Sequence, residues 1–558
     1  MTKRSRAVAR RGTEVGGAVG RETITRSGTR AALLCVLVLG AASLASAATA
    51  TRGSAAVRNG AANDGAAAVR NDCSGCHRET SPGHFDRISD IRKTPEGWAM
   101  TLFRMHQVHG LALDPAERDR VLRYLSDVGG LAPEEAAAGR FALERRPDAQ
   151  DLKLDDDMQA MCGRCHSLAR VALQRRDADE WLKLAHTHVG QWPSLEYQEG
   201  GRDRFWWQSA TTEYPKKLAA LFPLDTPAWR AWSRHPHPNL AGRWIVFGHT
   251  PGHGDYHGIA VITKKGADEY TATYTLTYAD GAKFDGTSKS VVYTGYEWRG
   301  SATLGGADVR EVFAAAEDGS EIKGRWFQTE HSESGGNWTA TRVEGAPKII
   351  AVSPRAARVG TSQQVALIGR GLQGDVNFGA GTHTTVVSRA PDALIVNVTV
   401  DGDASQGLRD VTVGKLKASG GAAIYRSIDR ITVEPAFAIA RLGGGRIAPV
   451  TAQFEAVGYL DSPAGGGPIS LGALPATWTV APHDAQAERA QDVKFAGSID
   501  QTGRFLPAGA GPNPAREFSG NNVGDLSVVA TVKDAAHDVQ AKSHLVVTVQ
   551  RWNTPPIY

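Results

Sequence analysis

Two pentads, Cys73-Ser74-Gly75-Cys76-His77 and Cys162-Gly163-Arg164-Cys165-His166, contain every cysteine of this chain beyond residue 47. The two thiols of such a pentad can each add to one vinyl group of a haem, and the adjacent histidine can then ligate the iron. Covalent attachment needs all three residues at this spacing. The sequence therefore predicts two covalently bound c-type haems, held by Cys73, Cys76 and His77 and by Cys162, Cys165 and His166.

Zinc and disulfide bonds are the alternative explanations of these cysteines. Zinc ribbons usually place their two Cys pairs roughly 15 to 20 residues apart, whereas 85 residues separate Cys76 from Cys162. Two disulfides are possible in an exported protein, but they give no reason for a histidine after both pairs. Both alternatives are weaker than haem.

The first 47 residues have the features of a secretory signal peptide. Eight Lys or Arg precede or border an apolar run at residues 31–39, and Ala45-Ser46-Ala47 forms an Ala-x-Ala cleavage site. Cys35 lies inside this segment and is expected to be removed with it. No segment approaches the roughly 18 apolar residues of a membrane span, so we expect no stable membrane insertion. Because haem c is attached on the far side of a bacterial inner membrane, we expect a periplasmic protein.

Removal of the signal peptide changes the charge of the chain. The peptide holds eight Lys or Arg and two Glu, so the formal net charge falls from +4 to about −2. The basic excess belongs to targeting and not to a binding surface. We therefore expect no nucleic-acid partner.

The remaining sequence predicts a multidomain protein, because it is longer than one hydrophobic core usually supports. Its helical pattern ends near residue 232, and short alternating segments with Gly turns follow. The expected fold is an α-helical dihaem cytochrome c domain followed by three antiparallel all-β domains. The expected boundaries are a flexible leader at 48–66, the dihaem domain at 67–232, a β-barrel-like domain at 239–345, an IPT/TIG-like immunoglobulin-like domain at 346–427, and an immunoglobulin-like β-sandwich at 428–558.

An internal repeat predicts the sixth ligand of each iron. Superposing Trp98 on Trp181 places Met105 on His188, each seven residues, or two helical turns, beyond its tryptophan. We therefore expect His77 and Met105 on the first iron, and His166 and His188 on the second. Methionine ligation raises the reduction potential relative to bis-histidine ligation, so the two haems are expected to be inequivalent.

Other residues compete for both sixth positions. His109 shares a helix face with Met105, Met100 lies nearby, and a lone methionine on an apolar helix face is usually a core residue. His186 lies about 200° around the helix from His188, so both cannot face one iron. The question of whether His109 or His186 replaces the proposed ligands stays open at this point.

Further segments carry a family resemblance over nearly the whole chain. They are residues 93–98 (KTPEGW), 201–207 (GRDRFWW), 235–242 (HPHPNLAG) and 293–300 (YTGYEWRG), in order after or between the two pentads. In this combination the chain resembles the dihaem α subunit of quinohaemoprotein amine dehydrogenase.

The resemblance implies a periplasmic heterotrimer that oxidises primary amines to aldehydes and ammonia. It implies a β-propeller β subunit, a small γ subunit that carries a cysteine tryptophylquinone, and a soluble acceptor such as azurin or a cytochrome c. Building that quinone consumes a cysteine, and both pentads use the cysteines of this chain, so we expect no catalytic residue here. The alternatives are a stand-alone dihaem electron carrier or sensor whose β domains bind another partner, and a dihaem enzyme of the peroxidase type.

Overall fold

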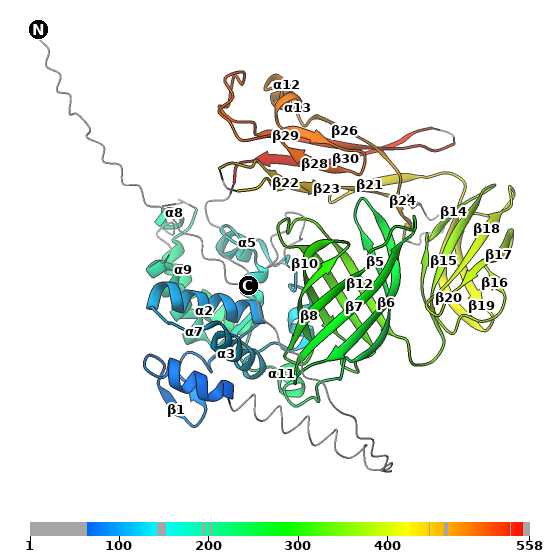
Figure 1. The fold of residues 1–558 in the computed structure, drawn as a ribbon. Coiled ribbons are helices and arrows are strands. Elements are labelled where there is room, and N and C mark those ends of the chain that lie inside the picture. Colours follow the sequence, from blue (N-terminus) through cyan, green and yellow to red (C-terminus); the bar gives the residue numbers. More distant parts are fainter. Residues whose placement is uncertain are drawn as a thin grey trace, which may run out of the picture. The chain divides into compact units, whose positions relative to one another are not determined.

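The computed structural model describes residues 64–141, 152–191, 196–200, 203–445, 447–461, 467–535 and 537–550. The predicted signal peptide at 1–47 and most of the predicted leader lie outside these residues. Figure 1 shows the order of the elements along the chain. In the described part of the chain, no helix combines the length and the apolar character that a membrane crossing requires.

The region that holds both pentads consists of helices and short strands. A helix over residues 64–73 comes first. The following elements are β1 (Glu79–Ser81), β2 (His84–Phe85), β3 (Ile91–Lys93), α2 (Pro95–His109), α3 (Pro115–Val128), α4 (Pro133–Ala137), α5 (Asp156–Cys162), α6 (Ala169–Ala172), β4 (Gln174–Arg176), α7 (Ala178–Gln191), α8 (Glu196–Glu199), α9 (Trp206–Thr212), α10 (Tyr214–Leu221) and α11 (Pro227–Trp232).

The predicted fold class was therefore wrong. The chain is mostly β, with 22% of its residues in helices and 43% in strands. The pentad region is not an all-helical domain, because β1 pairs with β2 and β3 pairs with β4 inside it. Strands of two or three residues are too short to show an alternating pattern, which is why helical periodicity dominated the prediction.

The β3–β4 ladder joins the two halves of the internal repeat. Its antiparallel register pairs Ile91 with Arg176, Arg92 with Arg175, and Lys93 with Gln174. The sequence offset that superposes Trp98 on Trp181 also superposes Arg92 on Arg175, so the central pair joins two equivalent residues. The residue pairs of this ladder are consequently related by a local twofold axis.

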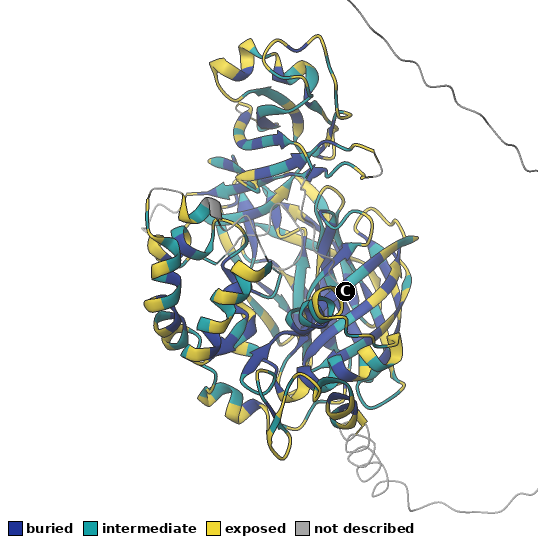
Figure 2. Ribbon diagram, turned by 90° about the vertical axis from the view of Figure 1, so that its left-hand side faces the viewer, coloured by how far each residue is buried: buried dark blue, intermediate teal, exposed yellow. Residues whose placement is uncertain are grey.

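A closed eight-stranded antiparallel barrel follows the pentad region (Figure 1). Its strands are β5 (Gly242–Thr250), β6 (Gly254–Lys264), β7 (Glu269–Tyr278), β8 (Gly286–Tyr293), β9 (Glu297–Leu304), β10 (Ala307–Ala315), β11 (Glu321–Gln328) and β12 (Gly335–Arg342). Inward positions are filled by aromatic side chains such as Trp244, Tyr274 and Trp298, and Figure 2 shows the buried residues alternating along these strands. The barrel interior is a packed core.

The barrel shares its core with the end of the pentad region. Leu131, Leu173 and Trp232 belong to the same hydrophobic cluster as the barrel aromatics. The Trp232 indole N–H donates to Thr294 O at 2.8 Å, and the Tyr296 hydroxyl donates to Leu131 O at 3.1 Å. These contacts fix the pentad region against one end of the barrel.

The described residues after the barrel form five sheets. Two four-stranded sheets contain β13 (Lys348–Ser353), β14 (Ala356–Arg358), β15 (Ser362–Arg370), β16 (Val376–Asn377), β17 (Thr382–Arg389), β18 (Ala393–Val400), β19 (Gly407–Val413) and β20 (Leu416–Tyr425). Three further sheets contain β21 (Arg430–Glu434), β22 (Phe437–Arg441), β23 (Ala452–Gln453), β24 (Glu455–Leu460), β25 (Ile469–Leu474), β26 (Thr477–Pro482), β27 (Gly497–Ile499), β28 (Arg504–Pro507), β29 (Gly524–Val532) and β30 (Val539–Thr548). Two short helices, α12 (Ala485–Arg489) and α13 (Asp492–Phe495), lie between β26 and β27.

Candidate haem-binding site

The first pentad forms a tight turn at the end of the helix over residues 64–73. The backbone N–H groups of Cys76 and His77 both donate to Cys73 O, at 3.1 and 2.8 Å. The His77 imidazole is fixed by its Nδ1, which lies 2.9 Å from Asp86 O. A bond of this kind places the proton on Nδ1 and leaves Nε2 as the metal-binding atom. His77 is therefore oriented as a ligand before any metal is considered.

The second pentad begins at the last residue of α5. Asp155 caps this helix by accepting a hydrogen bond from Met158 N at 2.7 Å. The His166 Nδ1 lies 3.0 Å from Ser167 O, so this imidazole also offers Nε2 to a metal. Both pentads thus present a histidine in the same tautomeric form, on turns that follow a helix.

All four pentad cysteines are free thiols. Burial, with a smaller contribution from neighbouring Asp72, raises the pKa of Cys73 to about 11, and burial with Asp157 raises the pKa of Cys162 to about 11. Zinc binding and thiol exchange both require thiolates. The surroundings of Cys73 and Cys162 thus favour neutral thiols over thiolates.

His166 and His188 lie close together in the second half of the repeat. His188 is on α7, and its Nδ1 lies 2.8 Å from Leu184 O. The two ring centroids are 6.4 Å apart, with the planes tilted by 36°. Two imidazoles that ligate one metal ion from opposite sides have centroids about 6 Å apart, because each metal–nitrogen bond is about 2 Å long. The pair has the spacing that an iron between them requires.

The surroundings of His188 favour the neutral imidazole that a metal needs. Burial lowers its pKa, and the charges of Arg104, Arg176 and Arg170 lower it further. His186 points elsewhere, since its ring makes an edge contact with Trp207 at a centroid distance of 4.9 Å. The structure therefore brings His188, and not His186, toward His166.

Met105 lies on the corresponding face of α2. It follows Trp98 and Leu102 at helical spacing, and both of those residues belong to the buried cluster on which Cys73 packs. No hydrogen bond joins Met105 to His77 among the described residues. Of its competitors, Met100 accepts a hydrogen bond at Sδ from Arg170 Nη2 at 3.6 Å, and His109 is exposed at the end of α2.

A buried carboxylate forms hydrogen bonds with both halves of the repeat. The sequence did not predict this contact. Glu135 accepts hydrogen bonds from Arg92 Nη1 at 2.8 Å, Arg92 Nη2 at 3.0 Å and Arg175 Nε at 3.1 Å. Burial alone would raise the pKa of Glu135, but the hydrogen bonds and charges of Arg92 and Arg175 lower it to about 2. Glu135 thus supplies one negative charge that is shared by two buried cations, which are paired across the β3–β4 ladder.

Each half also places a buried cation over its tryptophan. Lys93 Nζ lies 5.3 Å from the Trp98 ring, and the Arg176 guanidinium lies 5.7 Å from the Trp181 ring. The Trp98 indole N–H donates to Gly129 O at 2.9 Å. In the second half, Trp181 Nε1 and Arg176 Nε are buried without a hydrogen-bond partner among the described residues.

These two unpartnered donors indicate whether the second half of the repeat can accommodate a haem. Buried N–H groups are rarely left unbonded, since an unmade hydrogen bond costs roughly 1 to 3 kcal/mol. Trp181 belongs to the hydrophobic cluster on which Cys162 packs, and the Arg176 guanidinium lies over the Trp181 ring. A haem brings two propionate carboxylates, which are acceptors of the kind that these donors lack. The residues present therefore fit the group.

Sequence profiles of known families match four consecutive parts of the chain. The profile described as "Quinohemoprotein amine dehydrogenase A, alpha subunit, haem binding" matches residues 63–229. Profiles of alpha subunit domains II, III and IV of the same enzyme match residues 237–343, 346–426 and 431–557. Comparison with curated proteins finds no significant match.

Solved structures resemble parts of the chain only distantly. A redesigned β-barrel, mFAP1, bound to DFHBI is 16% identical, covering 18% of this chain and 92% of that one at a TM-score of 0.16. Mouse clustered PcdhgC3 EC1-3 is 11% identical, covering 43% and 86% at 0.15. The Bacteroides ovatus mixed-linkage glucan utilization locus SGBP-B, in complex with a mixed-linkage heptasaccharide, is 11% identical, covering 56% and 64% at 0.19.

The four profiles, all specific to one subunit of one enzyme, together span most of the sequence, and the first of them covers both pentads. The chain belongs to the family of quinohaemoprotein amine dehydrogenase α subunits, the haem-binding electron-transfer subunits of an oxidoreductase complex.

Proposed function

We propose that the chain is a two-haem electron relay. One haem c is held by Cys73, Cys76 and His77 with Met105 as sixth ligand, and the other by Cys162, Cys165 and His166 with His188. The observation that carries this proposal is the 6.4 Å spacing of the His166 and His188 rings, within a repeat whose other half places Met105 at the equivalent position.

The protein's own residues prepare these sites in two ways. Asp86 O, Ser167 O and Leu184 O orient the imidazoles of His77, His166 and His188. Arg176 and Trp181 supply donors for haem carboxylates. A bound haem iron accepts and releases one electron, and with both axial positions filled it is suited to electron transfer and not to activation of peroxide or oxygen.

We further propose the partners and location that the family resemblance implies. Electrons enter from a cysteine tryptophylquinone on a small γ subunit, a β-propeller β subunit completes a periplasmic heterotrimer, and azurin or a cytochrome c accepts the electrons. The amine is oxidised on the γ subunit, since all four cysteines of the described chain belong to pentads. We assign the haem region to 67–232 and three partner-facing β domains to 239–345, 346–427 and 428–558.

Co-purification separates this proposal from a stand-alone dihaem carrier or sensor. Periplasmic extraction under mild conditions is expected to yield the chain with a small subunit that stains for a quinone and with a third subunit. Residues 1–47 are expected to be missing from the mature chain by mass spectrometry. A haem protein that runs alone, with no quinone-staining companion, contradicts the proposed complex.

Met105→His is expected to lower the midpoint potential of the first haem. Imidazole replaces a thioether ligand, and axial ligands move haem potentials over about 0.8 V, so we expect a fall of roughly 0.1 to 0.3 V. Spectropotentiometric titration measures it, with Met100→Leu as the matched control. An unchanged potential, together with loss of low-spin character in His109→Ala, would assign the sixth position to His109.

Arg176→Gln is expected to lower the midpoint potential of the second haem. A nearby cation favours the reduced iron, and one unit charge at about 10 Å with an effective dielectric near 20 corresponds to on the order of 50 mV. Arg176→Lys keeps the charge and should retain most of the potential. Arg230→Gln, which removes a half-exposed arginine paired with Asp225, should have no effect. If the second haem has the wild-type midpoint potential in all three variants, Arg176 acts only in packing.

A further inference from the structure

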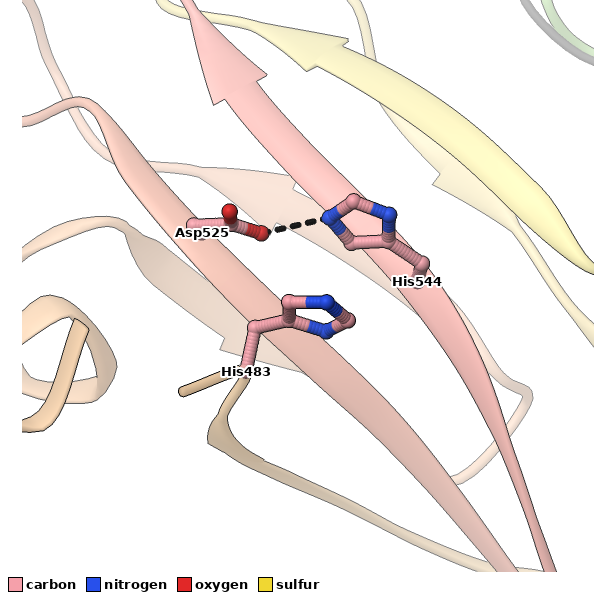
Figure 3. Close-up of side chains that lie close together, drawn as sticks. All are labelled: His483, Asp525 and His544. Carbon is pink, nitrogen blue, oxygen red and sulfur yellow. Dashed lines mark hydrogen bonds and ion pairs between the residues drawn. The ribbon is translucent and has the colours of Figure 1, made fainter. Parts of the chain in front are cut away.

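A second cluster of metal-binding side chains lies far along the sequence from the haem region. His483 directly follows β26, Asp525 is on β29 and His544 is on β30 (Figure 3). These three strands are neighbours in one sheet, in the order β30-β29-β26. Two of the side chains therefore come from paired strands, and His483 lies at the bend that directly follows the third strand.

The strand register places all three on one face of the sheet. His544 pairs with Ser527, two residues from Asp525, and His483 N donates to Asp525 O at 3.2 Å. The alternate residues Leu526 and Leu545 point the other way, into the hydrophobic core. The cluster thus occupies the face opposite that core, where a small ion can reach it.

The ligand atoms are close together. One such atom of each residue lies within 4.8 Å of the others, and His544 Nε2 lies 2.6 Å from Asp525 Oδ1. The two imidazoles stack with centroids 3.8 Å apart and planes 14° from parallel. An ordinary His–Asp ion pair accounts for His544 and Asp525, but it gives no reason for a second imidazole stacked on the first.

Ser527 orients the second imidazole. Its hydroxyl lies 3.3 Å from His483 Nδ1, and the serine is buried. Bonds of this kind to the non-ligating nitrogen fix metal-binding histidines in proteins. His483 therefore presents Nε2 on the side where His544 and Asp525 meet.

We propose that His483, Asp525 and His544 bind one divalent first-row transition ion of the Zn²⁺ class. Two imidazole nitrogens and one carboxylate oxygen form a ligand set that such ions favour, with a fourth position for water. Ligand atoms in a tetrahedral site with bonds of about 2.1 Å lie about 3.4 Å apart. The ion takes the place of the His544–Asp525 hydrogen bond, and the two imidazoles rotate out of their stack so that their nitrogens converge on it.

Zinc titration of the intact haem-loaded protein tests this site. After dialysis against a chelator, isothermal titration calorimetry with ZnCl₂ is expected to show one equivalent bound per chain. His483→Ala and His544→Ala should each weaken binding by about 100-fold or more, and Ser527→Ala by roughly tenfold. Zinc K-edge absorption should show imidazole scattering that is lost in both histidine variants.

His383→Ala is the matched control, because His383 forms an exposed ion pair with Asp401 at 3.1 Å but belongs to no three-ligand cluster in the described part of the chain. It should bind zinc like the wild type. Haem spectra and circular dichroism check the fold of each variant. If an alanine variant fails to fold, His483→Gln is used in its place, because position 483 is exposed. Absence of a zinc equivalent in the wild type, or equal affinity in wild type, His483→Gln and His544→Ala, overturns the proposal.

Discussion

His188→Ala is expected to open the sixth position of the second haem and to make its ferrous form bind carbon monoxide. The imidazole of His188 faces His166 at the distance that one iron requires, and alanine supplies no replacement ligand. The native protein should bind no carbon monoxide at either iron if, as proposed, Met105 and His188 fill both sixth positions. Difference spectra of the dithionite-reduced protein, with and without carbon monoxide, measure the change.

His186→Ala is the control for this experiment. It removes an imidazole two residues away that contacts Trp207 and does not face His166. Its haem spectrum should match the wild type. Carbon monoxide binding in His186→Ala but not in His188→Ala would reverse the assignment, and binding by the native protein would favour an enzyme of the peroxidase type.

Glu135→Gln is expected to destabilise the protein by about 3 to 5 kcal/mol, because it leaves the buried Arg92 and Arg175 without a counter-charge. The side chains of Arg92, Arg175 and Glu135 are 5%, 9% and 5% exposed, so water cannot compensate for the loss. Chemical denaturation followed by circular dichroism gives the free energy of unfolding. Glu134→Gln, at the exposed neighbouring position, should change it by less than about 0.5 kcal/mol.

The contribution of Glu135 to the free energy of unfolding depends on pH. Its pKa is lowered to about 2 in the folded protein, whereas an unfolded Glu titrates near 4.3. The stabilisation is therefore complete above about pH 5 and is lost as the pH falls toward 2. The difference between wild type and Glu135→Gln should shrink below pH 4. Equal stability of both proteins at pH 7 would show that the ion pairs contribute nothing.

The sequence predicted the features that depend on local spacing. The pentads carry their chemistry within five residues, and the comparison of Trp98 with Trp181 identified the repeat that the β3–β4 ladder now joins. The alternating segments of residues 239–345 correspond to strands that close into the barrel. In these places the residues that determine the structure are close in sequence.

Other features could not be read from the sequence, for two physical reasons. Glu135 meets Arg92 and Arg175 across about 40 residues, and a charged residue that becomes buried by such contacts looks like any surface charge in the sequence. The strands β3 and β4 have three residues each. Segments this short carry no alternating pattern, so nothing in the sequence indicated that the haem region contains strands. The unpartnered Trp181 N–H has no sequence signal at all.

Amine-dependent haem reduction in the complex purified from the periplasm is the most direct test of the proposed relay. A primary amine is added anaerobically to the oxidised complex, and the haem bands of this chain are followed by stopped-flow spectroscopy. The account predicts that both haems become reduced, and that His188→Ala or Met105→His changes this reduction without removing the quinone from its subunit. Haems that stay oxidised with every primary amine tested, while dithionite reduces them normally, would contradict it.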